Sequence, residues 1–245
     1  ILLGEKEYKD GINITPDQIY SWSDANKTTP KTSAPALSET IELFRPYVEG
    51  GRNIVCFSIS NSMSSSGNVM QLAAEELNAQ DLITVIDSAN LSTGIGLLVI
   101  EAAILAQNNK TAAEISVAVE NLKPYVRASF VVDTLTYLHR GGRCSAIAAM
   151  AGGLLKLHPQ IIVEHGAMKP TKKYRGKMDS VILSYVKDME PALKHARPDR
   201  VFITHSGCEP TIINAVRSYL EGLGIFREIL ETRAGGVISS HCGPG

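Results

Sequence analysis

Short apolar runs alternate with longer segments of helical periodicity along most of this 245-residue chain, and this alternation limits the folds available to it. Six runs of five or six residues are predicted as β-strands: residues 53–58, 82–86, 128–133, 160–164, 200–204 and 226–231. Five segments have the length and spacing of helices: residues 67–79, 94–107, 111–123, 178–196 and 210–223. Strands that alternate with helices in this way are typical of parallel sheets, so the sequence predicts the α/β class.

Two of the predicted helices carry further local signals. The helix near residue 111 has Glu114 three residues after Thr111, which is the spacing of a capping box. In residues 94–107, apolar residues recur at the spacing that places side chains on one helix face: Ile95, Leu98, Val99 and Ala102. These signals support the existence of both helices more firmly than their ends.

A different pattern in residues 161–174 marks a second kind of unit. Two extended runs flank His165-Gly166, which predicts a β-hairpin. We therefore expect two α/β lobes, residues 1–140 and residues 141–245, with the antiparallel hairpin in the second lobe. Residues 21–35 are polar and include Pro30 and Pro35, so they are predicted as a loop.

Composition excludes several classes of function. The chain has 24 basic and 25 acidic residues, so its overall charge does not favour nucleic acid or an anionic membrane as partner. The longest apolar stretch, residues 94–106, includes Glu101 and is too short for a membrane span. Its four cysteines lie far apart, which favours reduced thiols and a cytoplasmic location. Its six histidines lack the spacing of metal ligands, so no metal is expected.

A serine-rich segment, "SISNSMSSSGN" (residues 58–68), follows the first predicted strand. Ser64, Ser65 and Ser66 should lie at the N-terminus of the next helix. The free backbone N–H groups and the positive end of the helix dipole suit an anion there, and the hydroxyls add donors. The alternative is a loop with one capping serine.

Three more polar segments lie before predicted helices or at a turn. In "KTSAPALSE" (residues 31–39), Thr32 and Ser33 precede a helical segment. In "VIDSANLSTGIG" (residues 85–96), a strand runs into a hydroxyl-rich turn and a helix. In "SSHCGPG" (residues 239–245), His241 precedes a Gly-Pro-Gly turn.

Together with "VDTLTYLHRGGRCS", "KPTKKYRGK" and "VFITHSG", these motifs make the chain resemble the DegV family of bacterial fatty-acid-binding proteins. The resemblance implies two α/β lobes that hold one long-chain fatty acid, such as palmitate, stearate or oleate. Its carboxylate would lie in the cleft between the lobes and its tail in an apolar tunnel. The motifs place Thr32 and Ser64 on the carboxylate and His241 near it, and no other cofactor is expected.

Two departures from the family pattern accompany this resemblance. Ser65 and Ser66 follow Ser64 where the family commonly has Gly then Thr, so the backbone would approach the carboxylate less closely, and Ser65 or Ser66 would share the role of Ser64. The chain also begins without the family's usual first strand, so we expect that strand to be missing from the N-terminal lobe.

Two apolar helix faces are candidates for the tunnel lining. One is the face of residues 94–107, and the other lies in "SAIAAMAGGLLKL", where four residues fall at helical spacing: Ala146, Ala149, Met150 and Leu154. The alternative is that both faces belong to an ordinary hydrophobic core.

The segment "KPTKKYRGK" carries five basic residues within residues 169–177. Such a run is compatible with a solvated face or with an edge strand protected from unwanted pairing. The family resemblance implies instead that Arg175 contacts a fatty acid kinase, which converts the presented fatty acid into an acyl phosphate. Arg140 and Arg143 are weaker candidates for that contact, and a basic patch would favour an acidic partner.

The main alternative is a serine hydrolase that uses Ser64, His241 and Asp87. No G-x-S-x-G elbow occurs in the chain, which weighs against this alternative. A phosphate-transfer enzyme is also disfavoured, because the chain has no G-x-x-x-x-G-K-[ST] motif. The segment "GIGLLV" lacks the third glycine of a dinucleotide-binding fingerprint. The sequence therefore favours a lipid-binding protein that is not itself an enzyme.

Overall fold

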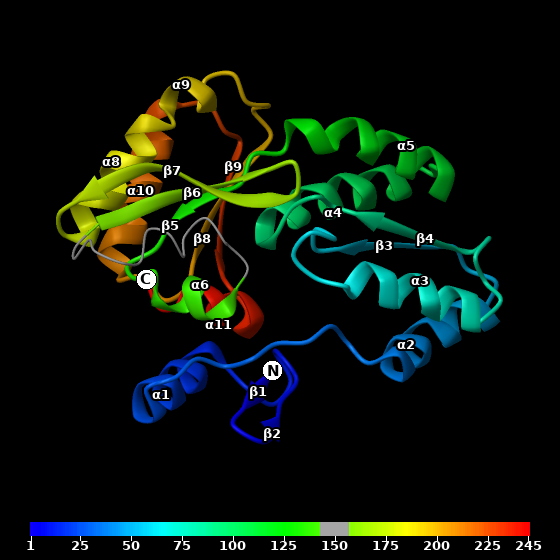
Figure 1. The fold of residues 1–245 in the computed structure, drawn as a ribbon. Coiled ribbons are helices and arrows are strands. Elements are labelled where there is room, and N and C mark those ends of the chain that lie inside the picture. The colour runs from blue at the N-terminus through cyan, green and yellow to red at the C-terminus, as the bar shows by residue number, and fades with distance from the viewer. Residues whose placement is uncertain (143–156) are drawn as a thin grey trace. The chain divides into compact units, whose positions relative to one another are not determined.

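The computed structural model describes residues 1–142 and 157–245 (Figure 1). The chain divides into two compact units. Unit 1 comprises Ile1–Thr32, Ser129–Ile162 and Lys169–Gly245, and unit 2 comprises Ser33–Ala128 and Val163–Met168. This division differs from the expected lobes at residues 1–140 and 141–245, because residues 1–32 and 129–140 pack with the C-terminal part of the chain.

Unit 2 is built on two parallel strands, β3 (Ile54–Ser58) and β4 (Ile83–Asp87), whose register runs from Ile54↔Ile83 to Ser58↔Asp87. The unit also contains five helical segments, in chain order: α2 (Leu37–Glu49), α3 (Ser66–Glu76), α4 (Ser92–Gln107), α5 (Ala112–Leu122) and a 3₁₀ turn at Lys123–Tyr125. In this unit α2 packs against α3, and α4 packs against α5 (Figure 1).

The alternation of side chains along β3 gives unit 2 its two cores. Ile54 and Cys56 pack with α2 and α3, whereas Val55 and Phe57 pack with α4 and α5. Successive residues of a strand point to opposite faces of the sheet, so helices must cover both faces. In α4, Leu98 is fully buried in the second core. Leu98 is therefore a core residue, which agrees with the second of the two interpretations given for this helix face, the hydrophobic core.

Unit 1 contains a parallel pair and a three-stranded sheet. The pair is β8 (Arg200–His205) with β9 (Glu228–Arg233), and the sheet has the order β5 (Ser129–Val131), β6 (Leu157–Glu164), β7 (Ala167–Arg175). Its main core joins β5, β7 and β8 to α8 (Met178–Asp188), α9 (Glu190–Leu193) and α10 (Pro210–Leu223). β1 (Leu2–Leu3), β2 (Lys6–Glu7), α1 (Pro16–Asn26), α6 (Thr136–Gly141) and α11 (Gly236–Cys242) complete the unit.

The hairpin prediction is confirmed. β6 and β7 are neighbouring strands joined by His165 and Gly166, with φ angles of 50° and 77°. Positive φ at both central residues is the geometry of a two-residue hairpin turn, which explains the glycine. The residues at this turn, Val163–Met168, belong to unit 2, although the rest of the hairpin belongs to unit 1.

Two element predictions differ from the structure. The helix expected at residues 178–196 is interrupted at Met189, because Pro191 cannot supply a backbone N–H to continue it. The loop expected at residues 21–35 is wrong for its first part, where α1 extends to Asn26. The missed signal was Thr15-Pro16-Asp17-Gln18, a capping box with proline at the first helical position.

Among the helices of residues 1–142 and 157–245, none is both long enough and apolar enough to cross a membrane.

We predict that Leu98→Ala lowers the free energy of unfolding by about 2–5 kcal/mol, since a fully buried side chain leaves a cavity. Urea denaturation followed by circular dichroism measures this loss. Val99→Ala on the same helix is the control, because Val99 is 42% exposed and its truncation should change stability by about 0.5 kcal/mol. Equal losses in the two variants would contradict the core assignment of Leu98.

Candidate functional site

Two of the predicted site residues meet in unit 1. Thr32 Oγ1 and His241 Nε2 are 2.8 Å apart, and both side chains are partly buried. The residues are 209 positions apart in the sequence, so only the tertiary fold brings them together. The pair presents a hydroxyl and an imidazole, which bind polar or anionic groups through hydrogen bonds.

Backbone pairing fixes the segment that carries Thr32. The N–H of Leu2 donates to the carbonyl of Lys31 at 2.8 Å, and the N–H of Lys31 donates back to Leu2 at 3.1 Å. Pro30, on the other side of Lys31, is buried. The threonine therefore follows a segment held on β1, although it lies outside any regular element.

Close packing between α6 and α11 fixes His241. A Cβ atom at Gly141, the last residue of α6, would lie 2.3 Å from His241 Nδ1. One at Gly243, where φ is 77°, would lie 2.6 Å from Tyr137 Cδ2. Both glycines are required because any side chain would occupy space that the rings fill. Two motifs from distant parts of the sequence, "TYLHRGG" and "SSHCGPG", thus form one packed contact.

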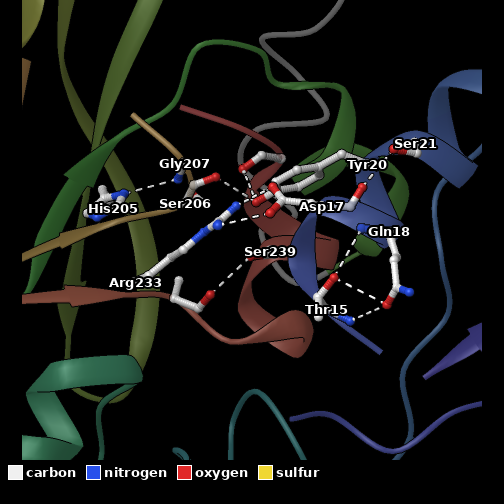
Figure 2. Close-up of polar contacts among 12 residues, drawn as sticks. Thr15, Asp17, Gln18, Tyr20, Ser21, His205, Ser206, Gly207, Arg233 and Ser239 are labelled. Carbon is white, nitrogen blue, oxygen red and sulfur yellow. Dashed lines mark hydrogen bonds and ion pairs between the residues drawn. The ribbon is translucent and has the colours of Figure 1, made fainter. Parts of the chain in front are cut away.

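Helix α1 ties the C-terminal turn to the end of β8 (Figure 2). The Tyr20 hydroxyl donates to the carbonyl of Ser206 at 2.7 Å and lies 3.3 Å from the carbonyl of Gly243. Burial raises the pKa of this phenol, so it stays a neutral donor. Arg233 at the end of β9 makes two hydrogen bonds to Asp17, whose carboxyl pKa it lowers (Figure 2).

The neighbouring Cys242 adds no charge to the site. Burial raises the pKa of its thiol to about 12, so it remains protonated at neutral pH. The absence of a thiolate beside His241 leaves this part of the site compatible with an anion.

In unit 2, the three serines lie at the start of α3, as predicted. Ser65 is the residue before the helix and Ser66 begins it. The N–H of Ser66 donates to Ser64 Oγ at 3.2 Å, and the two hydroxyls are 2.9 Å apart. Ser64 is partly buried and Ser65 is exposed. Ser64 is therefore a serine at a helix N-terminus whose hydroxyl already engages the backbone.

The hydroxyl-rich turn after β4 contacts the serine turn after β3. Asp87 Oδ1 accepts from the N–H groups of Ala89 at 2.9 Å and Asn61 at 3.3 Å, and the N–H of Ser60 donates to the carbonyl of Asn90 at 2.9 Å. Parallel pairing places the carboxyl ends of β3 and β4 at one edge, which explains this contact. The Asp87 carboxylate thus has a structural role in joining the two turns.

The hairpin turn also contacts this region of unit 2. The Ser62 hydroxyl donates to the carbonyl of Gly166, and a Cβ atom at Gly166 would lie 2.6 Å from Ser60 Oγ. Ser58 and Ser60 are almost fully buried. Of the serines in the segment, these two are therefore structural, and the three at the start of α3 remain the candidates for ligand contact: Ser64, Ser65 and Ser66.

Arg175 is exposed at the end of β7, while Tyr174 beside it is buried. Lys172 Nζ lies 2.5 Å from Asp188 Oδ2, which also accepts from the Tyr174 hydroxyl at 2.7 Å. Since strand side chains alternate, Lys173 and Arg175 share the face opposite to Lys172 and Tyr174. This exposed basic face lies on an edge strand of its sheet.

Other candidate residues are placed as follows. Arg140 donates to the carbonyl of Lys27 at 3.5 Å, within unit 1. Arg143 and the second set of candidate lining residues lie outside the described residues: Ala146, Ala149, Met150 and Leu154. In residues 1–142 and 157–245, no group of three or more His, Cys, Asp or Glu side chains is placed to hold a metal ion.

Sequence reasoning missed Gly141 and Tyr20. The motif "HRGGR" predicts a lobe boundary and two candidate docking arginines, but paired glycines at a helix end are also a signal of close approach. Tyr20 carried no comparable signal, because its partners are the carbonyls of Ser206 and Gly243 at the other end of the sequence.

These features define an α/β protein with hydroxyl-rich turns, and comparison with known proteins gives its family. The chain matches the profile of the DegV family, described as uncharacterised proteins, over residues 1–245. The chain therefore belongs to the DegV family.

Solved structures have the same fold. A fatty-acid-binding DegV family protein from Thermus thermophilus is 27% identical, with a TM-score of 0.85 over 97% of this chain and 84% of that one. A stearic-acid-binding protein from Eubacterium ventriosum is also 27% identical, with a TM-score of 0.82 over 98% of this chain and 84% of that one. The fatty acid kinase B3 protein of Streptococcus pneumoniae, loaded with linoleic acid, is 20% identical, with a TM-score of 0.85 over 99% of this chain and 85% of that one. At this lower identity the likeness concerns the fold.

We predict that Gly141→Ala displaces the His241 ring, because the new Cβ would lie 2.3 Å from Nδ1. The ring carbon and nitrogen signals of His241 in NMR spectra should therefore shift. Gly222→Ala is the control, since it lies in α10 with no atom within 4 Å of its new Cβ. His241 signals that respond equally to both changes would show that Gly141 does not hold the ring.

Proposed function

We propose that this protein binds a long-chain fatty acid and that Thr32 and Ser64 donate hydrogen bonds to its carboxylate. The observation that carries the proposal is the 2.8 Å contact between Thr32 Oγ1 and His241 Nε2. Its support comes from family membership and from two fatty-acid-binding structures at 27% identity. His241 takes part by directing the Thr32 hydroxyl.

The direction of the Thr32–His241 hydrogen bond determines what Thr32 offers a ligand. A threonine hydroxyl has one proton, and a carboxylate only accepts hydrogen bonds. While its hydrogen bond with His241 is kept, Thr32 can donate to a carboxylate only if His241 Nε2–H donates to Thr32 Oγ1. The bound state therefore requires a proton on Nε2 of His241.

Ser64 suits the same task. Its oxygen already accepts from the N–H of Ser66 at 3.2 Å, and when the Ser66 hydroxyl, 2.9 Å away, also donates to it, the Ser64 proton can be given to a ligand. The start of α3 adds the positive end of a helix dipole, which stabilises a negative group by about 0.3–1 kcal/mol. Ser65, exposed beside it, is a secondary donor in this proposal.

The tail would supply most of the binding energy. Each methylene removed from water contributes about 0.8 kcal/mol, so a long acyl chain binds tightly where a short one does not. Hydroxyl donors suffice for the head group because hydrogen bonds to a charged group contribute about 1.5–3 kcal/mol each.

The geometry gives less support to a serine hydrolase. Such an enzyme needs a base that takes the proton of the nucleophilic serine. Here His241 contacts Thr32, the Ser64 hydroxyl contacts Ser66, and Asp87 binds backbone N–H groups. These contacts favour binding over catalysis as the role of the three residues.

The proposal extends to a partner. We propose that the bound fatty acid is presented to a fatty acid kinase and that Arg175 forms part of the docking surface. The fold is shared with the kinase B3 protein of Streptococcus pneumoniae, and the β7 face with Lys173 and Arg175 is exposed. A basic surface accelerates encounter with an acidic one.

We predict that Thr32→Ala and Ser64→Ala each weaken binding of oleate roughly ten- to hundred-fold, because each removes one hydrogen bond to a charged group. Isothermal titration calorimetry with delipidated protein measures the change. Circular dichroism should show an unchanged fold in both variants.

Thr28→Ala serves as the control for these variants, since Thr28 is an exposed threonine four residues before Thr32. Its affinity for oleate should equal that of the wild type. If Thr32→Ala and Ser64→Ala also bind oleate with wild-type affinity, the assignment of the carboxylate site is wrong.

We predict that Arg175→Ala lowers the rate of acyl phosphate formation by a fatty acid kinase while oleate binding stays unchanged. Lys172→Ala is the matched control, because Lys172 lies on the other face of β7 and pairs with Asp188. Rates are compared in a coupled assay of ADP release, which accompanies phosphoryl transfer from ATP to the fatty acid, at low and high salt, since added salt weakens electrostatic docking. Equal rates for wild type and Arg175→Ala would remove Arg175 from the docking surface.

A further inference from the structure

We infer that Asp10 is a positioning residue for His241, acting through the N-terminus of α11. This inference rests on the proposed function, because it assigns the group that holds one side of the carboxylate site in place. Asp10 does not contact His241 and takes no part in binding chemistry itself. Its role is to fix the angle and position of the short helix that carries the imidazole.

The Asp10 carboxylate lies on the first turn of α11. Oδ1 accepts from the N–H of Gly236 at 2.6 Å, and Oδ2 accepts from the N–H of Val237 at 2.9 Å. These are the first two residues of the helix, and their N–H groups have no acceptor within it. The preceding residue is Gly235, which has no side chain to cap the helix. A residue 226 positions earlier in the sequence thus supplies the cap.

The negative charge of Asp10 also complements the helix. The N-terminus of a helix carries a partial positive charge, and a carboxylate at this end is stabilising. Because both oxygens are engaged, the carboxylate fixes orientation as well as position. Two accepted hydrogen bonds fix the first turn at two points, where a single acceptor would fix it at one.

Gly236 is the feature that permits this contact. A Cβ atom there would lie 2.7 Å from Asp10 Oδ1 and 2.9 Å from the Cδ1 atoms of Ile1 and Ile19. The glycine therefore allows the helix to approach both the carboxylate and the small apolar core of the N-terminal segment, against which Val237 also packs. The start of α11 is therefore closely packed against Asp10, Ile1 and Ile19.

The short length of α11 transmits the constraint to His241. The helix has seven residues, and His241 is five residues after Gly236, roughly 7.5 Å along the axis. Inside the helix, Ser239 and Ser240 are buried and donate to the carbonyls of Ala234 and Gly236. Two turns held this way move as one piece, so a tilt at Gly236 displaces the imidazole. Hydrogen bonds weaken steeply with distance and angle, so the contact with Thr32 would weaken.

The test uses Asp10→Ala, Asp10→Asn and a matched control, Asp188→Ala. Asp188 is a carboxylate of the same unit that also accepts two hydrogen bonds, from Lys172 and Tyr174, away from α11. We expect Asp10→Ala to weaken oleate binding about ten-fold. Asp10→Asn, which keeps one acceptor, should lie between Asp10→Ala and wild type. Asp188→Ala should lower the melting temperature but keep wild-type affinity for oleate.

A second readout does not depend on a ligand. Ring nitrogen and carbon signals of His241, assigned by their loss in His241→Gln, are recorded in each protein without fatty acid. They should shift in Asp10→Ala and in Gly236→Ala, and stay unchanged in Asp188→Ala. Gly236→Ala reaches the same contact from the helix side, so it keeps the test decisive if Asp10→Ala fails to fold.

The outcomes separate the two proposals. Unchanged His241 signals in Asp10→Ala, or in Gly236→Ala where only that variant folds, overturn the role of Asp10. Shifted signals together with wild-type oleate affinity in Asp10→Ala also overturn it, since the imidazole would then have no bearing on binding. A wild-type protein that takes up no fatty acid refutes the proposed function, and the NMR comparison still decides whether Asp10 positions His241.

Discussion

The proposed site depends on one hydrogen bond, the contact between Thr32 and His241. Thr32 has a single proton, so its partner decides whether the hydroxyl can donate to an anion. A histidine that donates from Nε2 turns the threonine into a donor toward the ligand, without any buried lysine or arginine. The surrounding fold of unit 1 serves to keep these two side chains at hydrogen-bond distance.

The distance between these two side chains is maintained by residues that do not contact the ligand in this proposal. Gly141 leaves room for the imidazole, Gly243 leaves room for Tyr137, and Tyr20 binds the carbonyl beside the terminal turn. Helix α11 has no capping side chain at its own start and relies on Asp10 for it. This short helix packs against α6 and α1, and groups from three other segments together define its direction. Removing any of them should affect His241 before it affects the fold.

In unit 2, the polar turns are brought together by strand pairing. The parallel register of β3 and β4 places Ser58 opposite Asp87, so the two turns that follow emerge at the same edge. Most of their polar groups are used to hold the turns together, as Asp87, Ser60 and Asn90 show. Ser64 and Ser65 remain at the start of α3, where the helix dipole favours an anion. Structural hydroxyls and the hydroxyls that we propose to bind the ligand thus lie within one short segment.

The sequence alone determined the strands, most of the helices, the hairpin at His165-Gly166 and the placing of three serines at a helix start, because periodicity, turn residues and caps act over a few residues. Family motifs in the sequence also made Thr32 and His241 candidate site residues. Only the tertiary structure decided that these two side chains touch, that Asp87 joins two turns, and that residues 1–32 pack with the C-terminal part of the chain. Asp10 has no local signature, and the glycine pair that includes Gly141 signals a close approach without showing which side chain lies there. Their roles come from packing between segments more than 90 residues apart, which periodicity and capping signals do not encode.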